Sequence, residues 1–410
     1  MRILFLQKRP LFPADSGGKI RTLNVLRHLA RSHEVTYLCN LQAGEEQSLG
    51  EMTRLGLQVE TVPWRETPRD SPLFYAELTQ NLFSRLPYNA AKDYDSQLRG
   101  RAARLLAQET FDLLICDFVQ MAGNAIGLDV PAKILFEHNV EAEIFRRHAE
   151  TDAGWLRRRY MTLQWRKMQR FEADAGRHFD TVIAVSRRDQ NLFESDYGWQ
   201  HVHVIDTAVD LDYFTPQPDL ERAGCVLFVG SMDWLPNQDG VRYFVSEVWD
   251  RIRQQCPQAT FRIVGRNPPP EIARLAEAPG VEVVGTVPDV RPYLAEAAVV
   301  VVPLRIGGGT RLKIFEAAAM KKAVISTSLG AEGLDVVPGE HLLVADDSES
   351  FGDAVVELLD NKVRRSTLAA RARELVVENY SSEAVAAQFE EICRKTVEQA
   401  ATVVPAAERR

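Results

Sequence analysis

The sequence predicts an α/β protein built of two Rossmann-like domains, whose parallel sheets face each other across a cleft. Apolar strand-like segments alternate with helix-like segments along the chain, which is typical of parallel, doubly wound sheets. The alternation is interrupted at residues 206–223 and restarts at Cys225. The 410 residues also provide enough chain for two domains of ordinary size.

The N-terminal domain is predicted over residues 1–205. Short apolar runs predict its strands, at 2–6, 34–39, 57–62, 113–117, 133–137, 181–185 and 202–205. Apolar residues at helical spacing predict helices over 19–30, 97–108 and 155–177. Ser186 directly follows a strand and is expected to cap the next helix.

Residues 206–223 are predicted to connect the domains, and the C-terminal domain is predicted over 224–380. Its strands are expected at 225–229, 260–264, 281–284, 299–302, 323–326 and 342–344. A last helix is predicted over 382–395, within a C-terminal segment 381–410 that ends in a flexible tail. Ligands of such sheets bind beyond the carboxyl ends of the strands.

Composition and charge exclude several classes of protein. The net charge of −8 argues against general nucleic-acid binding. The five cysteines are scattered and form no metal-binding pattern, so no metal site is predicted. The N-terminal apolar run is too short for a signal peptide, and no run approaches a membrane span. We therefore expect a cytoplasmic protein, with peripheral contact to the inner face of the membrane as an option.

The most informative segment is a glycine loop between a buried strand and an amphipathic helix. It consists of Gly307, Gly308, Gly309 and Thr310, followed by Arg311 and Lys313. Glycines let backbone N–H groups approach an anion, and the helix N-terminus adds positive potential. The two cations oppose the helix dipole, so a bound anion would compensate them. The alternative interpretation is a tight turn with exposed basic residues.

With these motifs in order, the sequence resembles the retaining glycosyltransferases of family 4, which have the GT-B fold. The resemblance covers almost the whole chain and rests on Gly17-Gly18, Ala184-Val185-Ser186, residues 210–214, Gly230-Ser231-Met232, Val264-Gly265, Gly285-Thr286-Val287, the glycine loop and Glu316. It implies that the last helix crosses back onto the N-terminal domain. It also implies an acceptor-side N-terminal domain and a C-terminal domain that binds a nucleotide sugar.

Two departures mark a divergent branch of that family. The family often has two glutamates eight positions apart, but Gly308 precedes Glu316 at that distance, which puts a carboxylate contact to the donor sugar in doubt. The interdomain connection often has Asn-Gly, whereas Thr207-Ala208 stands here.

The resemblance implies roles for individual residues. Arg311 and Lys313 would stabilise the leaving diphosphate as catalytic cations, and Glu316 would accept hydrogen bonds from the ribose hydroxyls. The remaining donor-binding residues would be Gly230, Ser231, Gly265, Val287, Gly307, Gly308, Gly309 and Thr310. The alternative for the two cations is that they are solvated surface residues. The alternative for Glu316 is a salt bridge or an interaction with the helix dipole.

On the N-terminal side, His138 follows a strand and would touch the transferred sugar as a catalytic residue. Glu141 is a weaker candidate for contact with the acceptor. Gly17 and Gly18 would let an acceptor or donor phosphate approach the first helix. The alternative for His138 is a structural role in its loop, and the alternative for Gly17 and Gly18 is an ordinary turn.

The implied activity is metal-independent, retaining transfer of a hexose from a nucleotide-diphosphate sugar to a sugar or lipid-linked acceptor in polysaccharide or glycoconjugate synthesis. A UDP-sugar is the expected donor substrate, and no cofactor is expected. In the family the leaving phosphate is thought to serve as the base, which suits a sequence without an obvious nucleophile. A nucleotide-sugar epimerase of the same fold and a catalytically silent nucleotide-sugar-binding protein remain alternatives.

A basic belt interleaved with aromatic residues stands out in this acidic chain. Its basic members are Arg146, Arg147, Arg157, Arg158, Arg159, Arg166, Lys167 and Arg170, and its aromatic members are Phe145, Trp155, Tyr160 and Trp165. Such a belt is suited to docking on anionic lipid or on a lipid-pyrophosphate acceptor. A solvated helix with snorkelling arginines explains the same pattern.

Overall fold

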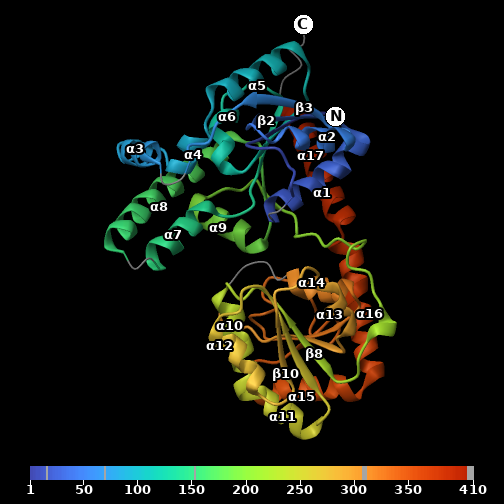
Figure 1. The fold of residues 1–410 in the computed structure, drawn as a ribbon. Helices are drawn as coiled ribbons and strands as arrows, with labels where there is room; N and C mark the ends of the chain where they lie inside the picture. Colours follow the sequence, from blue (N-terminus) through green and yellow to red (C-terminus); the bar gives the residue numbers. More distant parts are fainter. Residues whose placement is uncertain (15–16, 69–70, 152–153, 307–311, 404–410) are drawn as a thin grey trace. The chain divides into compact units, whose positions relative to one another are not determined.

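The chain folds into two compact units in a computed structural model that describes residues 1–14, 17–68, 71–151, 154–306 and 312–403 (Figure 1). One unit contains Met1–Asp206 together with Val385–Arg410, and the other contains Thr207–Ala384. Each unit has its own parallel sheet and its own hydrophobic core. The prediction of two Rossmann-like α/β domains is therefore confirmed, and the facing of their sheets across a cleft stays a prediction.

The N-terminal unit is built on a seven-stranded parallel sheet with the order β3-β2-β1-β4-β5-β6-β7. The strands are β1 (Arg2–Gln7), β2 (Glu34–Leu41), β3 (Gln58–Pro63), β4 (Leu113–Asp117), β5 (Ala132–Phe136), β6 (Thr181–Ala184) and β7 (Val202–Val204). Nearly every residue of β1, β4 and β5 is buried, because helices cover both faces of a parallel sheet. The strand order reverses between the neighbours β1 and β4.

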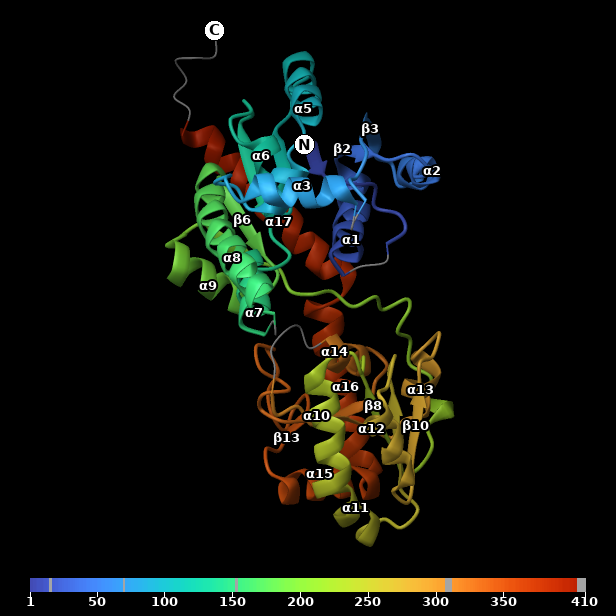
Figure 2. The same cartoon turned by 60° about the vertical axis from the view of Figure 1, so that its left-hand side comes forward.

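The helices of this unit are α1 (Gly17–Ser32), α2 (Glu46–Arg54), α3 (Pro72–Asn81), α4 (Tyr88–Asp93), α5 (Ser96–Gln108), α6 (Ala122–Ala125), α7 (Glu141–Thr151), α8 (Trp155–Ala175), α9 (Arg187–Tyr197) and α17 (Ser382–Val403). Figure 2 shows α17, in red, running alongside the N-terminal sheet. Its Phe389 ring is buried edge-on against Phe136 of β5, at 5.0 Å between centroids. Glu390 pairs with His28 of α1, with 2.7 Å between Oε2 and Nε2.

A buried carboxylate anchors the α7–α8 pair, which packs side by side at the edge of this unit (Figure 1). Glu172 of α8 is fully buried and accepts hydrogen bonds from the first two N–H groups of α7, those of Glu141 and Ala142, at 2.8 and 3.1 Å. It also accepts the Tyr197 hydroxyl at 2.8 Å. The side chain thus supplies acceptors that the first turn of α7 lacks. Burial still dominates and raises the pKa of Glu172 to about 8.

This burial predicts that the N-terminal unit loses stability as the pH rises. The folded pKa of Glu172, about 8, lies above the ordinary carboxyl value of 4.5. Between these two pH values the folded state keeps a proton that the unfolded state releases, so stability falls as the pH rises. Burial raises the pKa of the neighbouring Glu137 and Glu141 in the same direction. We expect the free energy of unfolding in urea to be larger at pH 5.5 than at pH 8.

Glu172→Gln should flatten this pH dependence, because the amide does not titrate. Asp174→Asn, on the same helix but 73% exposed, is the matched control and should leave the slope unchanged. If the free energy of unfolding depends on pH equally in wild type and in Glu172→Gln, Glu172 is not the group that causes the loss of stability.

The C-terminal unit has a six-stranded parallel sheet with the order β10-β9-β8-β11-β12-β13. Its strands are β8 (Cys225–Val229), β9 (Thr260–Val264), β10 (Val281–Gly285), β11 (Val299–Val302), β12 (Ala323–Ser326) and β13 (Leu343–Val344). Its helices are α10 (Leu235–Tyr243), α11 (Trp249–Gln255), α12 (Pro270–Ala273), α13 (Arg291–Glu296), α14 (Leu312–Ala319), α15 (Ser348–Asp360) and α16 (Lys362–Asn379). The strand order reverses between β8 and β11, so each unit offers one crevice at which a ligand can bind.

No helix in the described part of the chain combines the length and the apolar character that crossing a bilayer requires.

Candidate active site

Two bare backbone turns meet at the carboxyl ends of β8 and β9. Gly230 follows β8, and its N–H donates to the Val264 carbonyl at 3.0 Å. Gly265 follows β9, where any side chain would collide with the carbonyl oxygen of Gly230. A Cβ at position 230 would lie 2.7 Å from Lys313 Nζ and from Asn237 Nδ2. The backbone of Gly230 thus leaves no room for a side chain at Gly265, and the ends of the Asn237 and Lys313 side chains occupy the space beside Gly230.

Lys313, in the first turn of α14, places a cation at the switch point of this sheet, which is the place between β8 and β11 where the strand order reverses. Its Nζ donates to Asn237 Oδ1 at 2.7 Å and lies 4.5 Å from the centroid of the Phe228 ring. Asn237 is itself buried, and its Nδ2 donates to the Ser231 carbonyl at 2.7 Å. The amide therefore fixes the ammonium relative to the β8 turn. A fixed cation of this kind stabilises developing negative charge without reorganising.

Glu316 lies one turn further along α14 and is partly buried. Burial raises the pKa of its carboxyl group, and the positive charge of Lys313 acts in the opposite direction. The helix thus presents a cation and a carboxyl on consecutive turns. The other residues of the predicted phosphate loop, Gly307, Gly308, Gly309, Thr310 and Arg311, lie outside the described residues.

Ser231 belongs to a polar cluster beside the same turns. Its Oγ donates to Asp233 Oδ2 at 3.1 Å and accepts from Arg266 Nε at 3.0 Å. Arg266 also pairs with Asp233 at 3.1 Å. Val287 stands two residues beyond β10 and packs against the apolar core, so that only its backbone is suited to a polar ligand.

The N-terminal unit carries a buried polar network at its own switch point. Asp117 ends β4 with a fully buried side chain. Its Oδ2 accepts from Gln7 Nε2 at 2.7 Å and from Thr22 Oγ1 at 2.9 Å, and its Oδ1 lies 2.6 Å from His138 Nε2. Residues of β1 and α1, together with His138 just beyond β5, thus meet at the carboxylate that ends β4.

This network encloses His138. Its side chain is 1% exposed, and Nδ1 lies 3.0 Å from Arg21 Nη1. A guanidinium only donates and a carboxylate only accepts, which places the histidine proton on Nε2 and leaves Nδ1 as the acceptor. Phe118 and Phe136 lie against the imidazole, at 4.2 and 4.3 Å between centroids. Contact between His138 and the transferred sugar stays a prediction.

Gly18, in the first turn of α1, is explained by packing. A Cβ at this position would lie 2.7 Å from Phe118 Cζ, so the ring of Phe118 occupies the space that a side chain would need. Gly17 begins the same helix. Glu141, at the start of α7, is buried, and burial raises its pKa while bonds with Gln120 and Asn139 lower it. These positions place the predicted acceptor-side residues near the carboxyl ends of β4 and β5.

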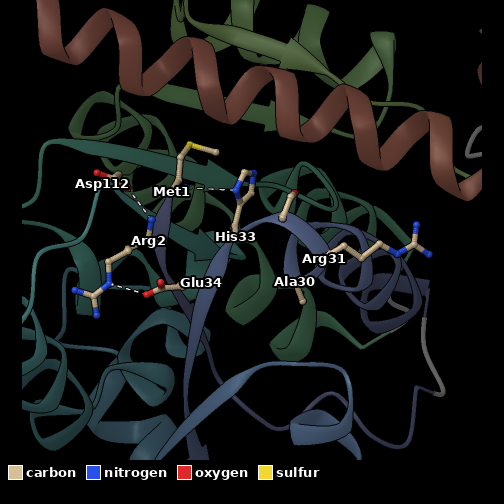
Figure 3. A pocket seen from close by; sticks show the side chains of 8 residues that line it. Met1, Arg2, Ala30, Arg31, His33, Glu34 and Asp112 are labelled. Carbon is tan, nitrogen blue, oxygen red and sulfur yellow. Dashed lines mark hydrogen bonds and ion pairs between the residues drawn. The ribbon is translucent and has the colours of Figure 1, made fainter.

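An open hollow of the N-terminal unit lies elsewhere. It has a volume of about 400 Å³ and is lined by Met1, Arg2, Arg31, His33, Glu34 and Asp112, among others (Figure 3). These residues stand at the amino ends of β1, β2 and β4 and at the last turn of α1. Because ligands of doubly wound sheets bind at the opposite edge, we do not assign the active site to this hollow.

Among the described residues, no three His, Cys, Asp or Glu side chains converge as metal ligands.

Two family models match the chain, one over each unit. A model described as Glycosyltransferase Family 4 matches residues 16–213, and one described as Glycosyl transferases group 1 matches residues 223–361. Each unit thus matches a glycosyltransferase family model, and the two-domain α/β layout is that of the GT-B fold. The first match covers most of the N-terminal unit, and the second contains Gly230, Asn237, Gly265, Lys313 and Glu316.

Individual proteins resemble the chain at low identity. A Klebsiella pneumoniae protein, described as an uncharacterized 44.6 kDa protein in the cps region, is 23% identical over 298 residues, which are 70% of this chain and 75% of that protein. The structure of Anabaena Alr3699/HepE in complex with UDP has a TM-score of 0.64 at 15% identity and covers 96% of this chain and all of its own.

Two further structures extend the comparison. Sucrose-phosphate synthase from Thermosynechococcus elongatus has a TM-score of 0.64 at 19% identity, with 97% of this chain and all of its own covered. WaaG, a glycosyltransferase involved in lipopolysaccharide biosynthesis, has a TM-score of 0.59 at 14% identity, with 95% and 99% covered. These likenesses show that the fold is shared.

Sequence reasoning missed several residues that the structure places at the two switch points. They are Asn237 in the C-terminal unit and Gln7, Arg21, Thr22, Asp117 and Phe118 in the N-terminal unit. One available signal was the polar residue at the end of each of two apolar strands, Gln7 and Asp117. Another was Pro236-Asn237 at a helix start, where a buried amide can reach the preceding turn.

Proposed function

We propose that this protein is a retaining, metal-independent hexosyltransferase that moves a sugar from a nucleotide-diphosphate sugar to a sugar or lipid-linked acceptor. The observation that carries the proposal is the ammonium group of Lys313, which Asn237 fixes beside the bare turn at Gly230. A diphosphate leaving group needs such a positive charge as the glycosidic bond breaks.

The donor site would occupy the switch point of the C-terminal unit. Lys313 and Arg311 would neutralise the diphosphate, and the N–H groups of residues 307–310 would bind its oxygens. Glu316 would accept the ribose hydroxyls, and Gly230 and Gly265 would keep the floor of the site open. UDP is the expected nucleotide, a choice supported by the complexes of Alr3699/HepE with UDP and UDP-glucose.

Retention of the anomeric configuration is proposed from the family resemblance. The acceptor hydroxyl would attack from the face that the diphosphate leaves, and the departing phosphate oxygen would take its proton. Synthesis of a polysaccharide or glycoconjugate is the proposed setting, supported by the similarity to a protein of the cps region and to WaaG.

A thermal-shift screen with nucleoside diphosphates tests nucleotide binding. A ligand at about 100 times its dissociation constant stabilises the folded protein by roughly 2.7 kcal/mol. We expect UDP to raise the melting temperature and Lys313→Ala to abolish most of that shift. A screen in which no nucleoside diphosphate stabilises the protein would contradict the proposal.

Activity is expected to persist in excess EDTA, because the fixed cations replace a divalent metal. The measurement is release of UDP from a UDP-sugar, with and without chelator. Complete loss of activity that magnesium or manganese restores would contradict the metal-independent mechanism.

We further propose that α8 docks the protein peripherally on the inner face of the membrane. Trp155 and Leu156 are each 65% exposed at the start of this helix, next to the exposed Arg157, Arg158 and Arg159. The Arg159 guanidinium lies 5.6 Å from the centroid of the Trp155 ring. An exposed tryptophan and leucine beside three arginines suit an anionic bilayer surface.

One member of the predicted basic belt does not belong to this surface. Lys167 is only 6% exposed, and its Nζ donates to the Asn81 carbonyl at 2.5 Å, which ties α8 to the end of α3. Its inclusion in an exposed belt was wrong, because a helix 21 residues long must bury one face against its neighbours. Phe83, just beyond α3, is 89% exposed and adds an apolar side chain to the same unit.

Replacing Arg157, Arg158 and Arg159 by Gln should weaken co-sedimentation with phosphatidylglycerol vesicles, by about 1 kcal/mol for each charge near the surface. Binding should also weaken as salt rises. The charge-matched control replaces three exposed arginines elsewhere on the same unit by Gln: Arg27, Arg31 and Arg54. Equal binding by both triple variants, or no binding at low salt, would leave α8 as a solvated helix.

A catalytically silent nucleotide-sugar-binding protein is the second candidate. It is favoured by Gly308, which stands where the family often has its first glutamate. Such a protein would bind UDP but would not cleave a UDP-sugar.

A further inference from the structure

Phe118 is the strained residue of the N-terminal switch point. It follows β4 with φ 69° and ψ 137°, a conformation that side-chain-bearing residues rarely adopt. The surrounding backbone enforces this conformation. The Phe118 N–H donates to the Phe136 carbonyl at 2.9 Å, and the Phe118 carbonyl accepts from the Met121 N–H at 3.0 Å. Strain that the fold holds in place is concentrated at ligand sites.

The ring of Phe118 is fixed from two directions. One face stacks on the imidazole of His138, with 4.2 Å between centroids and 26° between planes. The tip of the ring points at Gly18, where a Cβ would lie 2.7 Å from Cζ. His138 in turn is held by Asp117 and Arg21. The strain, the bare glycine and the buried network thus all fix the position of one phenyl ring.

Exposure distinguishes Phe118 from the groups behind it. The side chains of Asp117 and His138 are 0% and 1% exposed, whereas Phe118 is only partly buried. A ligand that reaches the carboxyl ends of β4 and β5 therefore meets the phenyl ring before it meets the imidazole. Gln120, two residues further on, has a buried Oε1 without a hydrogen-bond partner among the described residues, and its side chain bonds to Glu141. The side chains of Gln120 and Glu141 therefore provide polar groups for sugar hydroxyls beside the ring.

We propose that Phe118 is a binding residue for the sugar ring of the acceptor, and that His138 is a positioning residue that holds Phe118 from behind. The electron-rich face of a phenyl ring attracts the weakly positive C–H groups on one face of a pyranose. This inference rests on the proposed function only in taking the acceptor to be a sugar. It assigns no chemistry to His138 and needs no contact from the C-terminal unit.

The probes are methyl glycosides of glucose, galactose, mannose and N-acetylglucosamine, observed by saturation-transfer NMR on the full chain. We expect at least one of them to bind wild type and Phe118→Leu to reduce its signal by about fivefold, on the scale of an aromatic contact. Tyr75→Leu, which removes an aromatic ring 54% exposed on α3 of the same unit, should leave the signal unchanged. No binding by any glycoside, or equal signals from wild type and Phe118→Leu, would overturn the proposal.

A double-mutant cycle separates ring position from general damage to the fold. Gly18→Ala should displace the ring and reduce glycoside binding, although position 18 itself touches no sugar. In the Phe118→Leu background, Gly18→Ala should have little further effect, because the shorter side chain no longer reaches position 18. If the losses of glycoside binding caused by Gly18→Ala and by Phe118→Leu add up in the double variant, the proposal is overturned.

Stabilisation by UDP provides the independent readout in every variant. It should be preserved throughout, since it reports on the C-terminal unit. Loss of glycoside binding with UDP stabilisation intact supports the role of Phe118. A wild-type protein that binds glycosides through Phe118 but not UDP would sink the proposed function and leave this inference standing.

Discussion

Lys313→Ala is expected to lower the turnover of a nucleotide-sugar donor by roughly 10²–10³-fold, the cost of removing one preorganised group that stabilises developing charge. The size of the effect follows from how firmly the ammonium is held. Asn237 Oδ1 lies 2.7 Å from Nζ, and the Phe228 ring lies beneath it at 4.5 Å. Turnover is measured as UDP released from a UDP-sugar at saturating donor. By the family resemblance, Arg311→Ala should have a similar effect.

The matched control is Lys362→Ala, which removes an exposed lysine at the start of α16. It should leave turnover near the wild-type value. The fold of Lys313→Ala should survive, because this lysine is only partly buried. Near-wild-type turnover in Lys313→Ala would refute its role. Asn237→Leu should give a smaller loss of turnover, since the cation would remain but lose its fixed position.

His138→Ala is expected to reduce the free energy of unfolding of the N-terminal unit by about 3 kcal/mol, because it leaves the Asp117 carboxylate buried without one of its three hydrogen-bond donors. The cavity beside Phe118 adds to the loss. Urea unfolding at a fixed pH measures the change.

His178→Ala is the control for His138→Ala. His178 is 47% exposed and lies 3.8 Å from its partner Asp174, so its removal should change the free energy of unfolding by less than about 0.5 kcal/mol. Equal effects from the two substitutions would show that the buried network contributes nothing special to stability.

Much of the fold follows from short-range patterns in the sequence. Strands β8, β9, β11 and β12 begin and end where the apolar runs predict, and a glycine, a proline or a polar residue directly follows each of them. Ser186 caps α9 as expected, accepting the Asp189 N–H at 3.1 Å. Helix α8 ends at Ala175, and residues 176–178 continue as a single 3₁₀ turn, close to the predicted end at 177.

Helix α3 was not predicted, because its apolar residues do not follow one helical face. Leu73 and Tyr75 are 60% and 54% exposed. The available signal was Ser71-Pro72, an N-cap residue followed by proline at the first helical position. Amphipathic spacing identifies helices that cover a core, and α3 buries too little of its surface to show it.

The site residues were predictable only where a single segment carries them. Lys313 and Glu316 share one helix and were identified from that helix. Asn237 lies 76 positions from Lys313, and Thr22 lies 95 positions from Asp117, so neither pairing can be derived from local spacing. Gly18 was assigned to phosphate approach on a local pattern, whereas the structure supplies a packing reason from Phe118, which is distant in sequence.

The central claim is that the chain transfers sugars from a nucleotide donor, and donor cleavage tests it most directly. UDP-glucose, UDP-galactose and UDP-N-acetylglucosamine are incubated with the protein, and free UDP is measured beside the Lys313→Ala variant. We predict that wild type releases UDP from at least one donor, slowly to water and faster with a sugar acceptor, while Lys313→Ala releases roughly 10²-fold less. Binding of UDP without release from any donor would contradict the account and indicate a silent nucleotide-sugar-binding protein.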